Sequence, residues 1–234
     1  MDARKRFYKS ADVATLDNGY TVELDGRPVR TPMGNPLSIP TSALAQSVAA
    51  EWQNQGDTII PPSMPLNGMV NTAIDKISTE RTAVEQQLLK YAETDLLCYR
   101  AGTPEDLDRR QHECWQPLLD WAFDAFGAEL VVTRGILPVT QPKGAIKALH
   151  EAVSKLGNME LSAVAALTAD CGSLVVALAV FADHIDPGQA CHVALLDEAY
   201  QSEHWGLDKE AEDDQRRHRQ RIEQAGSFLY MIGK

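Results

Sequence analysis

The sequence predicts an α+β protein: a small β-rich N-terminal domain over residues 1–65, with one helix, and a larger, mainly α-helical domain over residues 66–234. The first third of the chain contains short alternating apolar segments separated by turn residues, which is typical of β-strands. The remainder repeats its apolar residues at intervals of three and four, as amphipathic helices do. Three prolines interrupt TIIPPSMP between these two patterns, so we expect the hinge there.

The N-terminal domain is expected to begin with a hairpin. GYTVEL alternates apolar and polar residues, and Asp25 and Gly26 follow it, a pair favoured in tight hairpin turns. The segment NPLSIP adds another short extended piece. Thr41 is the expected N-cap of a helix through Trp52, because apolar residues recur at helical spacing between them.

Helical patterns fill the second domain. The most apolar window, LSAVAALTADCGSLVVALAVFAD, is interrupted by Asp170 and Gly172. Each half is too short to span a bilayer, so we expect two buried helices and no membrane insertion. Asp186 and Pro187 start a further helix that should continue through Tyr200. Apolar spacing outlines three more helices over residues 84–91, 107–126 and 146–156.

Composition limits the classes of function. The 234 residues carry a formal net charge of −11, which argues against nonspecific binding to nucleic acid or anionic membranes, because phosphate groups have the same sign. None of the four cysteines forms a C-x-x-C pair, so we expect reduced thiols in a reducing compartment. The basic N-terminus is followed by no apolar segment and does not fit a secretory signal.

No catalytic or metal-binding motif is complete. His112 and His150 each precede a glutamate, as in zinc proteases, but the fourth residue after them is Gln116 in one case and Ser154 in the other. Glycine-rich phosphate loops and the G-x-S-x-G motif are also missing. We therefore expect no enzyme activity, cofactor or metal. The alternative is a carboxylate-dependent or metal-assisted hydrolase with its site between the two domains, because acids distant in sequence are not visible as a pair.

The most unusual segment is LDEAYQSEHWGLDKEAEDD, residues 196–214, where carboxylates surround one histidine and one tryptophan. Gly206 divides it. After Gly206, Asp208 is the expected cap of a helix whose early acids and later arginines complement the helix dipole. Two acid–arginine pairs at i, i+4 support that helix, Glu212 with Arg216 and Asp213 with Arg217. This half of the segment has a sufficient structural explanation.

Before Gly206, helical spacing separates the polar residues into two sides. One side holds Glu198, Gln201 and Trp205, and the other holds Asp197, Tyr200 and His204. An acid, an amide and a large ring suit a recognition surface better than a core, because Trp and Tyr are enriched at binding hot spots. Spacing alone leaves open a second arrangement, in which Trp205 lies in the core and Glu198 is merely exposed.

A set of segments resembles one known family. In order along the chain they are KRFYK, LDGRPVRTP, LSIPTSALAQSVAAEWQNQ, MPLNGMVNTAID, TDLLCYRA, WQPLLDWA and LDEAYQSEHWG. Together they are similar to the assembly chaperones of the F-type ATP synthase that bind its alpha subunit, found in mitochondria and related bacteria. The resemblance implies an ATP-independent chaperone that holds the free alpha subunit. It would cover the surface later occupied by the beta subunit until the alpha/beta hexamer assembles.

The resemblance also implies roles for individual residues. The family's acidic position, just ahead of a Tyr-Gln and a Trp-Gly pair, matches Glu198, and Trp52 in AAEWQNQ also matches, in either a binding or a structural role. The expected partner-binding residues are therefore Glu198, Gln201, Trp205, Asp197, Tyr200 and Trp52. We expect a monomer when free, in the cytoplasm of a bacterium, or in the mitochondrial matrix if this is a mature eukaryotic form. A general holdase without a preferred client is a further hypothesis.

Overall fold

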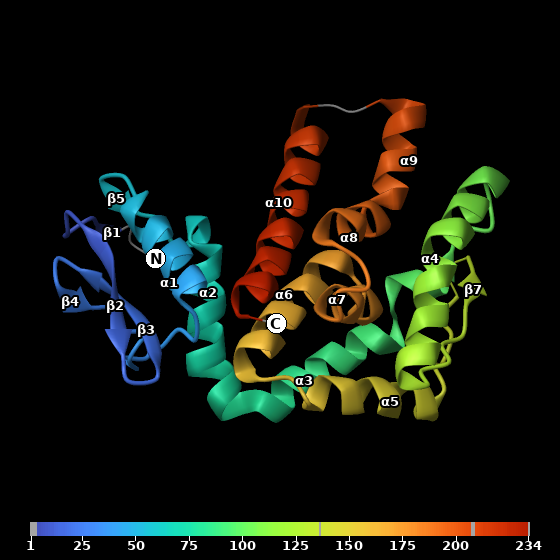
Figure 1. Cartoon of the computed structure of the whole chain (residues 1–234). Helices are drawn as coiled ribbons and strands as arrows, with labels where there is room; N and C mark the ends of the chain where they lie inside the picture. Colours follow the sequence, from blue (N-terminus) through green and yellow to red (C-terminus); the bar gives the residue numbers. More distant parts are fainter. Residues whose placement is uncertain (1–3, 136, 207–208, 234) are drawn as a thin grey trace. The chain divides into compact units, whose positions relative to one another are not determined.

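The computed structural model describes residues 4–135, 137–206 and 209–233, and it confirms the expected α+β class (Figure 1). The chain divides into two compact units. Unit 1 comprises Met1–Arg81, Gly157–Ala163 and Ser227–Lys234, and unit 2 comprises Thr82–Leu156 and Val164–Gly226. The domain boundary predicted after residue 65 lies inside unit 1, and it stays a prediction.

Unit 1 is built around a small antiparallel sheet with strands in the order β2-β3-β4 (Figure 1). Its strands and first helix are β1 (Arg4–Lys5), β2 (Ala11–Leu16), β3 (Gly19–Leu24), β4 (Arg27–Pro28), α1 (Ser42–Gln53) and β5 (Thr58–Ile59). The turn between β3 and β4 is the predicted one, because Asp25 (φ 50°) and Gly26 (φ 76°) both adopt the positive φ that this turn requires. β1 pairs with β5, and α1 packs against β2 and β3.

Local chemistry determines where α1 begins. The Thr41 hydroxyl accepts a hydrogen bond from the Leu44 backbone N–H at 3.3 Å, which confirms the predicted N-cap. Leu44 and Val48 are fully buried on the face of α1 that meets the sheet, together with Val22 of β3. The apolar spacing that predicted the helix is therefore the spacing of its buried side.

The proline-rich stretch expected as a hinge is regular structure within unit 1. It forms β5, the 3-10 helix η1 (Pro61–Ser63) and the start of α2 (Pro65–Asn71). The prolines are tolerated because they occupy first-turn positions, where no helical N–H partner is lost. A π-helical segment, η2 (Thr72–Ile77), connects α2 to α3 (Ser78–Glu93).

Unit 2 is mainly helical, as predicted. Its elements are η3 (Leu96–Cys98), β6 (Tyr99–Arg100), α4 (Glu105–Phe126), β7 (Thr133–Arg134), α5 (Lys143–Ser154), α6 (Asn158–Cys171), α7 (Leu174–Phe181), α8 (Pro187–Ala194), α9 (Leu196–Trp205) and α10 (Lys209–Met231). Helices α3, α6 and α10 contribute residues to both units. β6 and β7 form a short parallel pair. The apolar window forms α6 and α7, and no helix among the described residues is long and apolar enough to cross a membrane.

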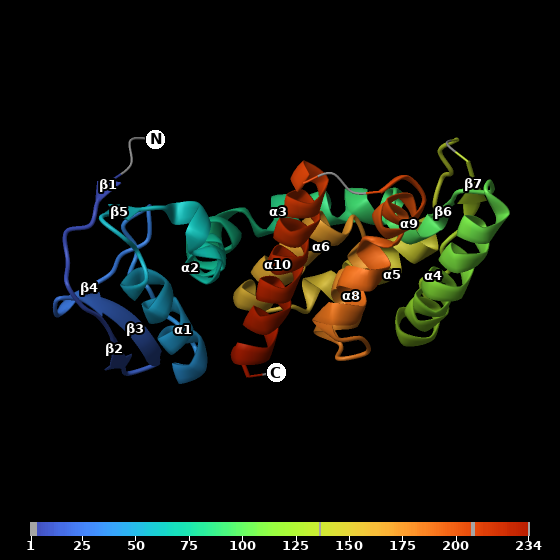
Figure 2. The ribbon, with the colours of Figure 1, turned by 90° about the horizontal axis from the view of Figure 1, so that it is seen from above.

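Helix α8 lies beside α10 in both views of the ribbon (Figure 1 and Figure 2). The approach is close at Gly226, where an added Cβ would lie 2.3 Å from Cγ of Pro187. Glycine is therefore required here for packing rather than for backbone freedom. The side chain of Asp186 caps α8 in a full capping box, as the Asp-Pro pair predicts.

Two predictions about the C-terminal helices were wrong in detail. The helix starting at Pro187 does not continue through Tyr200, because Leu195 leaves the helical region (φ −104°, ψ 18°) and separates α8 from α9. The ion pairs of α10 have i, i+3 spacing, Asp213 with Arg216 and Asp214 with Arg217, rather than i, i+4. The predicted cap Asp208 lies outside the described residues.

Candidate partner-binding site

One side of α9 is fixed to α4. The Asp197 carboxylate accepts a hydrogen bond from Nε2 of Gln111 at 2.7 Å, and the Tyr200 hydroxyl donates to Oδ1 of Asp106 at 2.8 Å. Tyr200 is only 4% exposed. These two sequence-predicted site residues therefore have partners within the chain, and their contacts hold the helix in place.

The contact between Tyr200 and Asp106 is also electrostatically favourable. The hydrogen bond from Tyr200 lowers the pKa of the Asp106 carboxyl, while burial, followed by the interaction with Asp106, raises the pKa of the Tyr200 phenol. The phenol therefore stays a donor and the carboxyl an acceptor at neutral pH. Arg110 reinforces the arrangement, because its guanidinium lies 5.2 Å from the Tyr200 ring centroid and pairs with Glu203 at 2.7 Å.

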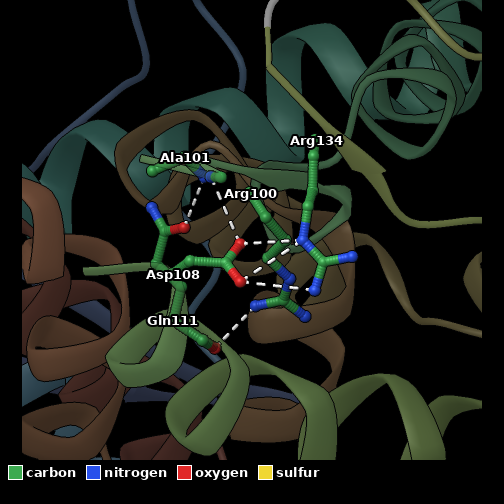
Figure 3. Close-up of polar contacts among 6 residues, drawn as sticks. Arg100, Ala101, Asp108, Gln111 and Arg134 are labelled. Atoms are coloured by element: carbon green, nitrogen blue, oxygen red, sulfur yellow. Dashed lines mark hydrogen bonds and ion pairs between the residues drawn. The ribbon is translucent and has the colours of Figure 1, made fainter. Parts of the chain in front are cut away.

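Behind this contact, a polar network fixes α4 to the β6 segment (Figure 3). Oε1 of Gln111 accepts from the Ala101 N–H at 2.7 Å, and the Gln111 backbone carbonyl accepts from Nη1 of Arg100 at 2.6 Å. Asp108, one turn earlier on α4, pairs with Arg134 at 3.1 Å. Gln111 is thus hydrogen-bonded to Arg100 and Ala101 as well as to Asp197 of α9. The orientation of α9 therefore depends on contacts made by the TDLLCYRA segment.

The other side of α9 carries Glu198, Gln201 and Trp205, all exposed, with Trp205 at 76%. Within the described parts of the chain, the side chains of these three residues make no hydrogen bond or ion pair. The arrangement with Trp205 in the core is therefore wrong. A large ring, an acid and an amide share one solvent-facing stripe, which we call the α9 stripe.

Trp52 belongs to unit 1 and has structural contacts. Its indole Nε1 donates to Oδ1 of Asn67 at 3.2 Å, and its backbone carbonyl accepts from the Tyr8 hydroxyl at 2.6 Å. The Tyr8 and Trp52 rings meet edge-on, with centroids 5.9 Å apart. Trp52 also lines an open apolar groove of about 1380 Å³ on unit 1. Its indole is therefore positioned by this unit and contributes to the groove wall.

Histidines, cysteines and acids are the side chains that could form a metal or thiol site. Among the residues that the structure describes, no group of three or more His, Cys, Asp or Glu side chains is placed to hold a metal ion. His204 contacts the Tyr200 carbonyl through Nδ1 at 2.9 Å. The four cysteines are free thiols, and burial raises the pKa of Cys98 to about 12 and that of Cys191 to about 11, so these two thiols stay protonated at neutral pH.

Sequence reasoning did not identify the anchoring residues of α4. Gln111 occupies a position in the apolar stripe of this helix and is only 1% exposed. A polar residue inside an apolar stripe was the available signal, because buried amides require hydrogen-bond partners. Asp106 gave no such signal, since acids are common in the first turn of a helix.

Known proteins similar to this chain carry the name ATP12. The profile of the ATP12 chaperone protein family matches residues 5–123. A curated relative, the mitochondrial protein atp12 of Schizosaccharomyces pombe, is 25% identical over an alignment of 222 residues that covers 89% of this chain and 76% of that protein. The crystal structure of Atp12 from Paracoccus denitrificans is 38% identical with a TM-score of 0.88, covering 98% of both chains. An aspartate-to-lysine mutant of the Paracoccus protein matches equally well.

Proposed function

This chain belongs to the ATP12 family of ATP synthase assembly chaperones, and we propose that it binds the free alpha subunit of the F-type ATP synthase through the α9 stripe. The observation that carries the proposal is the contrast between the two sides of α9. One side is held by Gln111 and Asp106. The other presents Glu198, Gln201 and Trp205, whose side chains make no hydrogen bond or ion pair in the described chain.

The stripe has the chemistry of a binding hot spot. An exposed Trp205 ring offers a large apolar contact, and such rings dominate the free energy of many protein interfaces. Glu198 would select a basic group on the partner, because complementary charge gives orientation and specificity. The helix is already fixed to α4, so little conformational freedom would be lost on binding.

A chaperone of this kind acts by occupying an interface. The alpha and beta subunits form a permanent complex, and the interfaces of such complexes are large and apolar when uncovered. A partner that binds only the free alpha subunit lowers, by mass action, the concentration available for aggregation. We propose that the chain needs no ATP for this, that it covers the beta-facing surface, and that the beta subunit later replaces it.

The remaining expectations follow the same proposal. The free protein would be a monomer without enzyme activity or cofactor. It would act in the cytoplasm of a bacterium, or in the mitochondrial matrix if the chain is a mature eukaryotic form. The Paracoccus and Schizosaccharomyces relatives are consistent with either setting.

Co-purification tests the identity of the partner. Tagged protein is recovered from an extract of cells that express the alpha and beta subunits separately, and bound subunits are identified by mass spectrometry. We expect the alpha subunit in stoichiometric amount at mild salt, and no beta subunit. Unrelated aggregation-prone proteins added in excess should not displace the bound alpha subunit. Recovery of no alpha subunit would contradict the proposal, and displacement by any unfolded protein would indicate a general holdase.

A further inference from the structure

Unit 1 carries an apolar groove that the α9 stripe does not include. Its volume is about 1380 Å³, above the roughly 300–1,000 Å³ typical of small-molecule pockets. Its walls come from the β3–β4 hairpin, α1, η1 and α2, and from Phe7 and Tyr8 near the N-terminus. Phe7 is 59% exposed and Ile60 54% exposed, so apolar side chains line an open surface rather than a closed core. The dimensions suit a segment of polypeptide.

Two asparagines of α2, Asn67 and Asn71, line the groove. Oδ1 of Asn71, on α2, is buried and has no hydrogen-bond partner in the described chain. Asn67 lines the groove one turn earlier, and its Oδ1 is occupied by the Trp52 indole, while its amide N–H groups have no partner among the described residues. Because Oδ1 of Asn71 is buried, a ligand in the groove does not reach it, and the Asn67 amide is the hydrogen-bond donor that remains available. A peptide backbone supplies carbonyl acceptors for such a donor.

Charge at the groove adds a further preference. Arg27 and Arg30 line it and are exposed, and Arg27 has no ion pair within the described residues. Asp25 also lines the groove, but its carboxylate is occupied by the backbone N–H groups of Lys9 and Ser10 at 3.0 and 2.9 Å. Nη1 of Arg30 donates to the Gly34 carbonyl at 2.8 Å, but neither guanidinium is paired with a carboxylate in the described chain, so both positive charges remain available to a ligand. They favour an acidic side chain on the ligand.

We propose that this groove binds an extended, apolar segment of the client polypeptide that carries at least one acidic residue. The inference rests on the proposed function, since the client is the free alpha subunit. It adds a second contact region on unit 1 and assigns peptide-backbone recognition to the Asn67 amide. A chaperone that grips its client at two separate surfaces gains affinity from both, because the second contact forms at high effective concentration.

Point variants of the full-length protein test the groove against intact alpha subunit. Ile60→Asp places a charge in the groove at an exposed position, and Arg27→Ala removes an exposed positive charge at the groove. Leu16→Asp is the matched control, because Leu16 is 39% exposed on β2 of the same unit and does not line the groove. We expect about tenfold weaker binding for Ile60→Asp and a several-fold loss for Arg27→Ala, with binding by Leu16→Asp unchanged. The thermal midpoints of Ile60→Asp and Arg27→Ala should stay at the wild-type value.

Immobilised 15-residue peptides that tile the alpha subunit separate this proposal from the function itself. Wild-type protein and Glu198→Lys should both bind a subset of apolar peptides with an acidic residue, and Ile60→Asp should not. If intact alpha subunit binds wild type and Ile60→Asp equally, the groove proposal is overturned while the function stands. If wild type binds neither intact subunit nor peptides, both proposals fail. A dimer of the free protein that Ile60→Asp dissociates would assign the groove to self-association and would also overturn the proposal.

Discussion

Replacing Asp95 by asparagine should remove a pH dependence of stability that is built into unit 2. Asp95 is fully buried, and its carboxylate accepts hydrogen bonds from the backbone N–H groups of Leu97 at 3.1 Å and Val175 at 3.2 Å. It thereby connects the start of η3 to the start of α7. Burial raises the pKa of Asp95 from its ordinary value of 3.8 to about 6, against the opposing effect of these hydrogen bonds.

The magnitude follows from linkage. The folded state binds a proton more tightly than the unfolded chain, so the contribution to stability is fully present below pH 4 and is lost as pH rises through about 6. A shift of about two pKa units corresponds to roughly 3 kcal/mol, at about 1.4 kcal/mol per unit. The difference in unfolding free energy between wild type and Asp95→Asn should therefore change by about this amount, in favour of the variant, between pH 4 and pH 7.

Urea unfolding at pH 4, 5, 6 and 7 measures this difference in unfolding free energy. The contributions of the other titrating groups are the same in both proteins and cancel in the difference. The steepest change should lie between pH 4 and pH 6. A difference that stays constant with pH, or that moves in favour of wild type as pH rises, would refute the reasoning. In either case the Asp95 pKa would not be raised by folding.

Two further changes probe the positioning of the candidate site and the packing around it. Tyr200→Phe removes the hydrogen bond to Asp106 and should lower the thermal midpoint by a few degrees, whereas an unchanged midpoint would show that this bond does not hold α9. Gly226→Ala places a Cβ against Pro187 and should destabilise by about 1–3 kcal/mol in urea unfolding. Gly68→Ala is its control on an open helical surface and should stabilise by about 0.4–1 kcal/mol. Equal effects of the two glycine changes would contradict the packing argument.

The elements that could be predicted from the sequence are those determined by local chemistry. The Asp25–Gly26 turn and the Thr41 cap require particular side chains at particular positions, and both occur where expected. The break at Leu195 was missed, because leucine is a good helix former and the local sequence contains no glycine or proline. Intrinsic propensity is a weak guide where tertiary context overrides it.

The candidate site was predictable only in part. Helical spacing showed that Glu198 and Trp205 share a side, but it does not show which side of α9 faces solvent. That is decided by Gln111 and Asp106, which precede α9 by some ninety positions. The groove on unit 1 was not visible either, because segments far apart in the sequence build it and its available donor, Asn67, is an ordinary helix residue by pattern.

The binding of purified alpha subunit to Glu198→Lys tests the central claim most directly. Glu93→Lys is the matched control, since Glu93 is an exposed helical acid of the same unit and, within the described residues, has no partner. Calorimetric titration should give a dissociation constant at least about tenfold weaker for Glu198→Lys, one within about twofold of wild type for Glu93→Lys, and equal thermal midpoints for all three proteins. Equal affinity of wild type and Glu198→Lys for the alpha subunit would contradict the account.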